Sequence, residues 1–473
     1  MIKYQPMLPL EFAQPVTEHP VDNYRQELVS LLSGDFDFHD EASDYATHNF
    51  HSFPAKFPPQ LPHKIIYALT SPGEIVLDPM SGSGTTVVEA FLADRRAIGF
   101  DIDPLALRLV KAKVTPLDAG QIADMASCLL GQTRQKIKES DRQKYLQKFY
   151  QQIDEGTRSF INYWFSAETQ LELAILLQEI WKIESDDLRI FFELAFSSII
   201  ITKSGGVSLA FDLAHTRPHR AKVIKSTTGD ILWQADNIEQ ISAKRVAVLT
   251  KTLRSPLAEF EKRLEQNIAG LVQSQRGQYR PFITGGNAQT MPLPDDSIDL
   301  IVTSPPYASN AIDYMRAHKF SLAWLGYPID DLGQLRKEYI GGEAITDFEF
   351  TEMPRFSKKI VQQVSAKDEK KGRVLHRYYS EMHRTLQEMY RVLKPGKAAI
   401  VVVGSSTLRG VDTETHNCLA DIGEAIGFEV PKIGIRLLDR NRRMMPAGMK
   451  VNHDSQIQQR MHEEYLIGFY KPG

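Results

Sequence analysis

The sequence predicts an α/β fold in which a mostly parallel, doubly wound sheet is interrupted by a large helical insert. Two observations predict the sheet. Apolar runs that end in aspartate flank a helical stretch before residue 115, and the same texture resumes after residue 286. Between them, apolar residues recur at helical spacing, which predicts the insert. We therefore expect an acidic N-terminal segment (1–47), one α/β domain in two pieces (48–115 and 286–473) and a helical insert (116–285).

Composition limits the class of protein. The chain has 473 residues, 42% of them hydrophobic, and a formal net charge of −3, as expected of an ordinary globular protein. Its two cysteines cannot build a disulfide framework or a four-cysteine zinc site. The start shows no secretion signal, and no apolar run reaches about 18 residues, so we expect a cytoplasmic protein without a membrane span.

The first α/β unit begins with EIVLD at 74–78, which predicts a buried strand. A glycine-rich turn, PMSGSGTT, follows at 79–86. VVEAFLA at 87–93 then predicts a helix, and AIGFD at 97–101 predicts a second strand. The order strand, turn, helix, strand is one βαβ unit.

The glycine-rich turn favours a nucleotide-like ligand. Gly82 and Gly84 allow a tight turn and a close approach of the backbone, and Asp101 at the next strand end can accept hydrogen bonds from both hydroxyls of a ribose. A Walker A loop needs Gly-Lys, but Thr85 follows Gly84, and a dinucleotide site needs a small residue where Val87 stands. S-adenosylmethionine matches best. Another nucleotide and a plain tight turn remain alternatives.

The insert and the second α/β stretch follow from periodicity and turn signals. A polar, basic stretch at 204–229 should interrupt the insert, and the following helix should restart at Pro256, a good first helical residue after a serine cap. Helices are expected at 168–184, 186–201 and 242–270, and later strands at 299–303, 398–404 and 464–470.

The loop Ser304-Pro-Pro-Tyr307 directly follows the strand at 299–303. Two prolines fix the backbone, so that carbonyl groups can act as rigid acceptors, and the tyrosine ring offers a face on which a base can stack. Acceptors from Ser304 and the Pro305 carbonyl suit the exocyclic amine of a base, which would attack a sulfonium methyl directly. The alternative is a strand-end turn with a packed tyrosine. However, both motifs lie at carboxyl ends of strands, where ligands bind in open α/β sheets.

With both motifs present, the chain resembles the amino-methylating DNA methyltransferases, which modify cytosine N4 or adenine N6. The resemblance covers residues 48–115 and 285–470 and implies a Rossmann-like S-adenosylmethionine-dependent methyltransferase fold, with a target-recognition region in the insert. Its segments are HSFPAKFPPQL, VLDPMSGSGTT, GFDIDP, GGNAQTMPLPDDSIDLIVTSPPY and VLKPGKAAIVVVG.

Carried over by position, the resemblance implies catalytic roles for Ser304, Pro305, Pro306 and Tyr307. The implied cofactor-binding residues are Lys56, Phe57, Asp78, Pro79, Met80, Ser81, Gly82, Gly84, Thr85, Thr86, Asp101, Ile102, Asn287 and Ala288. Two of them depart from the family: Met80 stands where phenylalanine is usual, and Asn287 where an acidic residue is common. Both can still contact a cofactor, through an apolar side chain and through an amide.

Ser304 before Pro-Pro implies N4-cytosine methylation of duplex DNA, with adenine N6 as the alternative. An RNA amino-methyltransferase shares both motifs, and a non-catalytic DNA-binding protein is a third possibility that the intact motifs disfavour. C5-cytosine methylation needs a cysteine nucleophile in a Pro-Cys loop, and a zinc deaminase needs Cys-x-x-Cys; the chain has neither. From the resemblance alone, we expect a separate restriction endonuclease as a partner.

Basic stretches give the expected DNA contacts. The net charge of −3 is a sum over an acidic start and three basic stretches at 203–225, 355–377 and 432–450, each of which could also be a solvated face. We expect 357–371 to be a flexible loop that orders on DNA. A metal site is not expected, because His215 and His219 lack a third ligand. The expected contact residues are Arg217, His219, Arg220, Lys222, Arg442 and Arg443.

Overall fold

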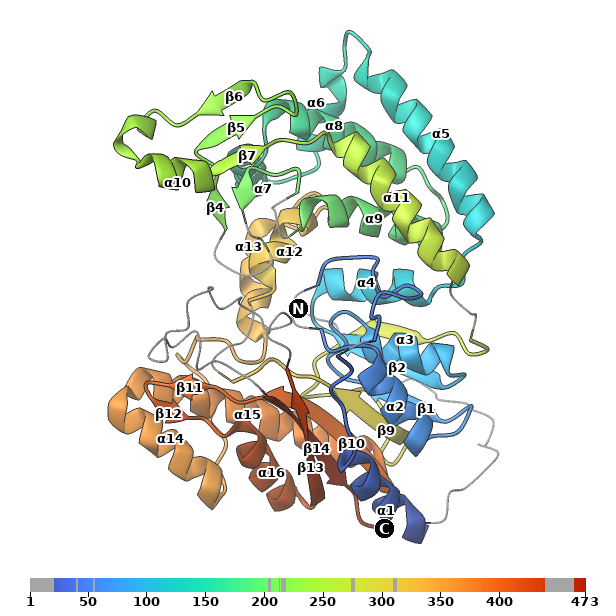
Figure 1. Cartoon of the computed structure of the whole chain (residues 1–473), viewed down its shortest axis with the longest axis vertical. Coiled ribbons are helices and arrows are strands. Elements are labelled where there is room, and N and C mark those ends of the chain that lie inside the picture. The colour runs from blue at the N-terminus through green and yellow to red at the C-terminus, as the bar shows by residue number, and fades with distance from the viewer. Residues whose placement is uncertain are drawn as a thin grey trace.

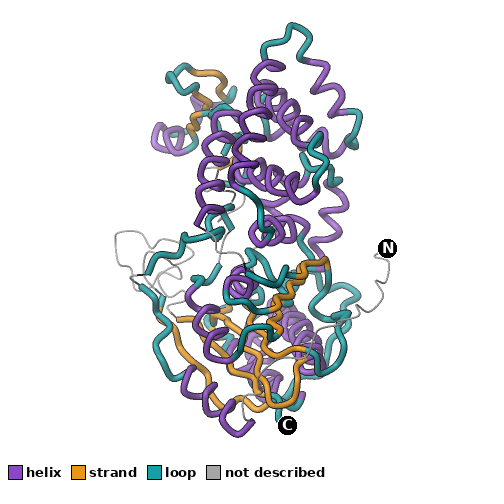
Figure 2. The backbone as a smooth tube through the Cα atoms, turned by 90° about the vertical axis from the view of Figure 1, so that its right-hand side faces the viewer, coloured by secondary structure: helices purple, strands orange, loops and turns teal. Residues whose placement is uncertain are grey.

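The computed structural model describes residues 21–39, 41–53, 56–202, 206–211, 213, 218–273, 277–308, 313–438 and 463–473. Two parts are stacked along the long axis: an α/β part below and a mainly helical part above (Figure 1). Figure 2 shows the same division from the side, with most strands gathered in the lower part and helices filling the upper one.

The lower part is built on a seven-stranded sheet in the order β13-β14-β10-β9-β1-β2-β8. Its strands are β1 (Ile75–Asp78), β2 (Arg96–Asp101), β8 (Phe282–Gly285), β9 (Ile298–Thr303), β10 (Leu393–Gly404), β13 (Glu429–Leu437) and β14 (Glu463–Tyr470). From β10 through β9, β1 and β2 to β8, all neighbouring strands pair in parallel. β14 runs antiparallel to both of its neighbours, β10 and β13. The predicted fold class, a mostly parallel Rossmann-like methyltransferase sheet, is therefore confirmed.

Helices cover both faces of this sheet, because successive strand residues point to opposite sides. In β10, Ile400 and Val402 pack on one face, and Val401 and Val403 pack on the other. The first face carries α1 (Val21–Leu32), α2 (Gln60–Leu69), α3 (Thr85–Leu92) and α4 (Pro104–Val114). The second carries α14 (Arg355–Lys367), α15 (Glu369–Val392) and α16 (Thr415–Ile426). The sheet is thus buried on both sides, as its continuous apolar strands require.

The upper part has a separate core centred on Trp324, which is fully buried and stacks on Phe149 with ring centroids 4.8 Å apart. Its helices are α5 (Ala119–Ile137), α6 (Gln143–Tyr150), α7 (Glu155–Trp164), α8 (Ala167–Ile180), α9 (Asp186–Ile200) and α11 (Pro256–Gln273). Two helices from beyond the insert join this core, α12 (Met315–Leu322) and α13 (Ile329–Leu335). The upper part is therefore assembled from two separate stretches of chain.

A small β region interrupts the helices, where the sequence predicted a loop-like stretch. It consists of β3 (Ala210–Phe211), β4 (His219–Arg220), β5 (Val223–Lys225), β6 (Ile231–Gln234), β7 (Thr250–Thr252) and the short helix α10 (Ala243–Val248). The strands form one two-stranded and one three-stranded sheet. The helix expected at 242–270 is therefore split into α10 and α11 by β7.

Three details differ from the sequence analysis. β8 pairs with β2, so the residues before 286 already belong to the large sheet and not to the insert. Within the acidic segment, α1 packs on the sheet through Tyr24 and Leu28. The stretch 357–371 is helical rather than a flexible loop, because α14 buries an apolar face against the core and Asp368 caps α15. Its many charges lie on the opposite, solvated face of an amphipathic helix.

Three further features of the described part of the chain concern membrane spans, metal ligands and cysteines. No described helix is both long and apolar enough to cross a membrane. The residues that the structure describes contain no group of three or more histidine, cysteine or acidic side chains that could hold a metal ion. Both cysteines are free.

Candidate active site

An open cavity of about 920 Å³ lies where β1, β2 and β9 end. This volume includes space open to solvent, and both sequence motifs reach the cavity. Fourteen of the predicted residues line it: Lys56, Phe57, Asp78, Pro79, Met80, Ser81, Gly82, Thr85, Asp101, Ile102, Asn287, Ala288, Ser304 and Pro306.

Four predicted residues are not on the cavity wall, and three of them have a clear structural place. Gly84 has a φ of +75°, and a Cβ there would lie 2.8 Å from Val110, so this glycine is required for packing. Thr86 donates a hydrogen bond to the carbonyl of Val302 at 3.1 Å. Tyr307 turns its hydroxyl toward Glu464 of β14. The fourth, Pro305, is buried.

Several wall residues were not predicted. Phe53 lies in the HSFPAKFPPQL segment, so the predicted cofactor contacts of its neighbours there could have indicated that it also lines the cavity. Tyr314 and the turn at 338–340 belong to the stretch after the catalytic loop, which carries no motif. The unpredicted wall residues are Phe53, Ser83, Asp103, Ala106, Gly286, Tyr314, Glu338, Tyr339 and Ile340.

The glycine-rich turn is held against β2 by backbone hydrogen bonds to Asp101. The Gly82 N–H donates to one carboxylate oxygen at 2.7 Å, and the Asp103 N–H donates to the other at 2.8 Å. Gly82 has a φ of +47°, which a glycine adopts without strain. Asp101 therefore shapes the turn as well as facing the cavity.

Asp78 joins the two motifs. Its side chain accepts a hydrogen bond from the Thr303 hydroxyl at 2.7 Å, so the last residue of β1 is tied to the last residue of β9. Ser304, the first residue of the catalytic loop, comes next. The cofactor turn and the catalytic loop are thus fixed relative to one another by adjacent parallel strands and a side-chain bond.

Both cavity carboxylates have raised pKa values. Burial raises the pKa of Asp78 to about 6, although bonds from Thr303 and the Met80 N–H oppose the shift. Burial and the neighbouring Asp103 raise the pKa of Asp101 to about 7. Among the described residues, no lysine, arginine or histidine forms an ion pair with either carboxylate. A positively charged ligand would stabilise the ionised form of both carboxylates and so lower their pKa values.

Asp103 is the contrasting carboxylate. It accepts hydrogen bonds from His318 Nδ1 at 2.5 Å and from the Tyr339 hydroxyl at 2.8 Å, and it caps α4 through the Leu105 N–H at 2.8 Å. Burial alone would raise its pKa, but His318 and these hydrogen bonds lower it overall. Asp103 therefore anchors α12 and the 338–340 turn beside the cavity.

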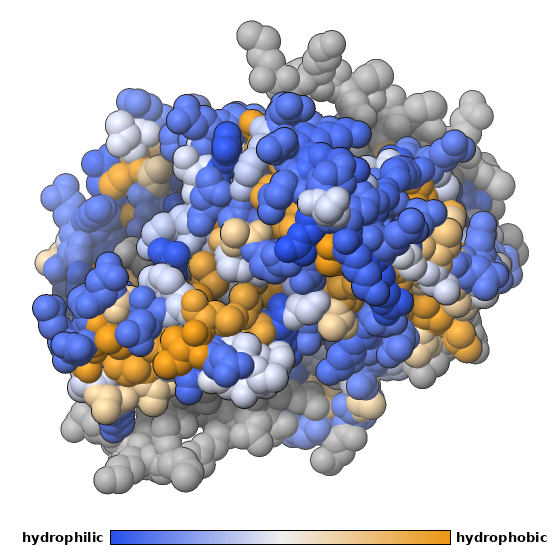
Figure 3. All heavy atoms as spheres, turned by 90° about the horizontal axis from the view of Figure 1, so that it is seen from above, coloured by the Kyte–Doolittle hydropathy of each residue, from blue (hydrophilic) through white to orange (hydrophobic). Residues whose placement is uncertain are grey.

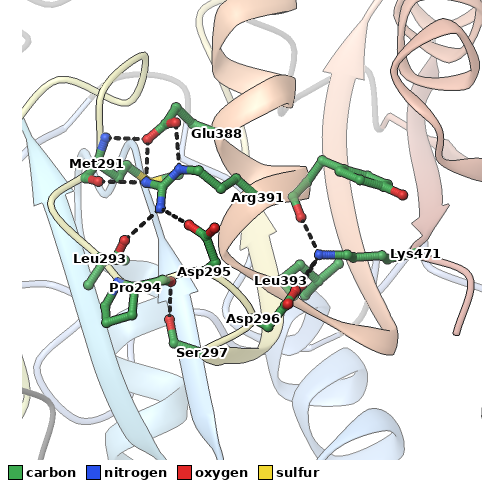
Figure 4. A network of polar contacts seen from close by, with 11 residues as sticks. Met291, Leu293, Pro294, Asp295, Asp296, Ser297, Glu388, Arg391, Leu393 and Lys471 are labelled. Carbon is green, nitrogen blue, oxygen red and sulfur yellow. Dashed lines mark hydrogen bonds and ion pairs between the residues drawn. The ribbon is translucent and has the colours of Figure 1, made fainter.

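The segment that leads from Asn287 to β9 is fixed from outside the cavity (Figure 4). Arg391 of α15 donates to the carbonyls of Leu293 and Met291 at 2.7 and 2.8 Å, and it pairs with Glu388 and Asp295. A single guanidinium, which has five N–H donors, thus hydrogen-bonds carbonyl and carboxylate oxygens along this turn. This network sets the path of the chain between the cavity wall and the strand that carries Ser304.

The predicted nucleic-acid contacts are only partly visible. Arg217, Arg442 and Arg443 lie outside the described residues. His219 is exposed on β4, and Lys222 is half-buried. The guanidinium of Arg220 lies over the rings of Tyr163 and Trp233, at 4.7 and 5.2 Å from their centroids. Arg220 is thus partly engaged within the insert.

Apolar side chains are also exposed on this small β region. Ile231, Leu232 and Trp233 of β6 and Val248 of α10 are among the most exposed large apolar residues described. Figure 3, which looks down on the helical part, shows apolar side chains gathered within a largely hydrophilic surface. The face is thus mixed, with aromatic and basic groups close together.

Comparisons with known proteins bear on the family resemblance. Residues 30–112 match a family model described as DNA methylase, covering N6 and N4 methyltransferases. Type II methyltransferase M.MvaI of Kocuria varians is 27% identical over 397 residues, which span 80% of each chain. Type II methyltransferase M.AvaI of Anabaena variabilis is 25% identical over 388 residues, 76% of this chain and 74% of that one. These similarities support the resemblance inferred from the sequence: the chain is similar to the amino-methylating DNA methyltransferases.

Proposed function

We propose that the protein transfers a methyl group from S-adenosylmethionine to the N4 amine of cytosine in duplex DNA. One observation carries the proposal: the wall of a single cavity contains Asp78 and Asp101, which have raised pKa values and no ion-pair partner among the described residues, together with Ser304 and Pro306 of the Ser-Pro-Pro-Tyr loop. The carboxylates suit a cationic cofactor, and the loop suits an exocyclic amine. The relatives named type II methyltransferases support a role in restriction and modification, beside a separate endonuclease.

The cavity residues match S-adenosylmethionine in charge and shape. Asp78, with its raised pKa, would hold the methionine ammonium, and its ionisation would be favoured by that cation. Asp101 would accept the ribose hydroxyls, while Ile102 and Ala288 would flank the adenine. When bound, the cofactor supplies a methyl on a positively charged sulfur, whose bond to carbon breaks as the carbon–nitrogen bond forms.

Ser304 and the Pro305 carbonyl would hold the target amine. Two acceptors on its N–H groups would draw the nitrogen lone pair out of conjugation with the ring and aim it at the methyl group. Tyr307 would offer its ring to the base. No covalent enzyme intermediate is needed, which agrees with the absence of a cysteine from the loop.

The target base must leave the helix to reach this cavity. Phosphate contacts would come from basic residues of the insert and of the stretch beyond β13, and base readout from the small β region beside His219. The exposed aromatic and basic side chains there support this assignment.

Transfer of a labelled methyl group tests the proposal. The purified protein is incubated with labelled cofactor and, in separate reactions, with mixed-sequence duplex DNA and with transfer RNA. We expect label in DNA alone, released on hydrolysis as N4-methylcytosine. N6-methyladenine would assign the alternative base, and label only in RNA would overturn the DNA assignment. Ser304→Ala serves as the inactive control.

A further inference from the structure

Glu464 lies at the catalytic edge of the sheet although it belongs to the last strand. Because β14 is antiparallel, its first residues reach the edge where β9 and β10 end, opposite Gly404. Glu464 is buried, and one carboxylate oxygen accepts a hydrogen bond from the Tyr307 hydroxyl at 2.9 Å. A residue 157 positions away thus holds the aromatic residue of the catalytic loop.

Arg436 compensates the charge of Glu464. The two residues stand directly opposite each other on β13 and β14, and Arg436 Nη1 donates to the second carboxylate oxygen at 2.5 Å. Their side chains are only 4% and 11% exposed. The guanidinium donates to this carboxylate, and a carboxylate can only accept hydrogen bonds.

This arrangement sets the direction of the next hydrogen bond. Since Glu464 can only accept, the Tyr307 hydroxyl must donate its single proton to it, and its oxygen is left as an acceptor. The hydroxyl of Tyr307, in the same loop as Ser304, is thereby fixed as a donor to Glu464.

We propose that Glu464, held by Arg436, is a positioning residue that fixes the Tyr307 hydroxyl as a donor and so holds the ring of Tyr307 for the target base. The inference rests on the proposed function and deepens it. The pair explains how the aromatic residue of the catalytic loop is oriented from the last strand of the sheet.

Glu464→Gln tests this with little change in shape. Its amide oxygen must face Arg436, so its NH₂ group faces Tyr307, and the Tyr307 hydroxyl changes from donor to acceptor. We expect the single-turnover rate of methyl transfer to fall roughly 10- to 100-fold, while KM for cofactor and DNA stays within about twofold. Glu463→Gln is the matched control: its carboxylate accepts from the Tyr465 hydroxyl at 2.8 Å and should leave the rate unchanged.

A double-mutant cycle separates positioning from mere strand pairing. If Glu464 acts through Tyr307, then Glu464→Gln should slow the Tyr307→Phe variant little further. An equal slowing in both backgrounds, with a lower unfolding temperature, would show that the residue only holds β13 and β14 together, and would overturn the proposal. An unchanged rate in Glu464→Gln would overturn it as well.

A spectroscopic readout keeps this test independent of turnover. The Raman difference between the wild-type protein and Tyr307→Phe isolates the ring doublet of Tyr307, whose intensity ratio reports whether the hydroxyl donates or accepts. We expect a donor in the wild-type protein and an acceptor in Glu464→Gln. An unchanged ratio contradicts the role of Glu464 even if methyl transfer occurs. Absence of transfer with the expected ratio contradicts only the proposed function.

Discussion

Two kinds of buried carboxylate meet at the edge of the sheet. Asp78 and Asp101 face the cavity without an ion-pair partner among the described residues, and burial raises their pKa values. Asp103 and Glu464, close by, are bound by His318 and Arg436. The unpaired carboxylates are costly to keep ionised, and we propose that a cationic ligand compensates this cost. The paired ones hold loops in position.

This difference gives opposite pH dependences. A carboxylate whose pKa is raised by folding destabilises the folded state as the pH rises from its ordinary value toward the raised one. Asp103, whose pKa is lowered, stabilises the folded state above its ordinary pKa, and this contribution is lost as the pH falls. The carboxylates proposed to bind a ligand therefore lower the stability of the folded protein at high pH. The paired carboxylate a few residues away raises it.

Asp78→Asn should have the largest effect on binding. The amide keeps an acceptor for Thr303 but removes the charge, so affinity for S-adenosylmethionine should fall by roughly 100-fold, as for loss of a buried ion pair. At pH 8, the free energy of unfolding should rise by about 1–3 kcal/mol, because a raised pKa means a costly buried charge. Calorimetric titration and urea unfolding measure the two quantities. Unchanged affinity would remove Asp78 from the cofactor site.

The pH profile of cofactor binding should show the same group. As the pH falls through about 6, Asp78 takes up a proton, and affinity should then fall about tenfold per pH unit. In Asp78→Asn, this dependence should be weaker, with Asp101 responsible for what remains near pH 7. A wild-type profile that is flat from pH 8 to 5 would contradict the assignment of both carboxylates.

Tyr339→Phe should have a smaller effect, mainly on the free energy of unfolding. The change removes one of the hydrogen bonds to buried Asp103, at a cost of about 1–2 kcal/mol. The stability should fall less at pH 5 than at pH 8, because the hydroxyl stabilises the ionised form of Asp103 and the upward shift in the Asp103 pKa lets protonation offset part of the loss at low pH. Thermal unfolding at the two pH values checks this. Equal losses at both would show that the hydroxyl does not act through Asp103.

Asp295→Ala should have the smallest effect. Asp295 also pairs with an arginine, Arg391, but its side chain is 71% exposed. Solvent screens such a pair, so the loss should be below about 1 kcal/mol. Glu388→Ala, which removes the less exposed partner of Arg391 and an acceptor for the Met291 N–H, should cost more in the same urea titration. The reverse order would show that burial does not decide the strength of these pairs.

The sequence predicted the residues that meet at the cavity far better than the residues that hold them in place. Asp78, Asp101 and Ser304 lie in short motifs next to strand ends, so their meeting follows from parallel strands. The partners of Asp103 lie 215 and 236 residues away, and they come from segments without a motif. Only the strand order brings them together. The many charges at 357–371 led to the prediction of a flexible loop, which was wrong. The stretch is helical, because its fewer apolar residues form one buried face.

Identification of the modified nucleoside tests the central claim most directly. Duplex DNA is incubated with the protein and with S-adenosylmethionine carrying a deuterated methyl group, then digested to nucleosides and analysed by mass spectrometry. The proposal predicts deuterated N4-methylcytosine with the wild-type protein and none with Ser304→Ala. Deuterated N6-methyladenine would contradict the choice of base. Deuterated C5-methylcytosine, or unlabelled DNA from a protein that binds the cofactor, would contradict the function itself.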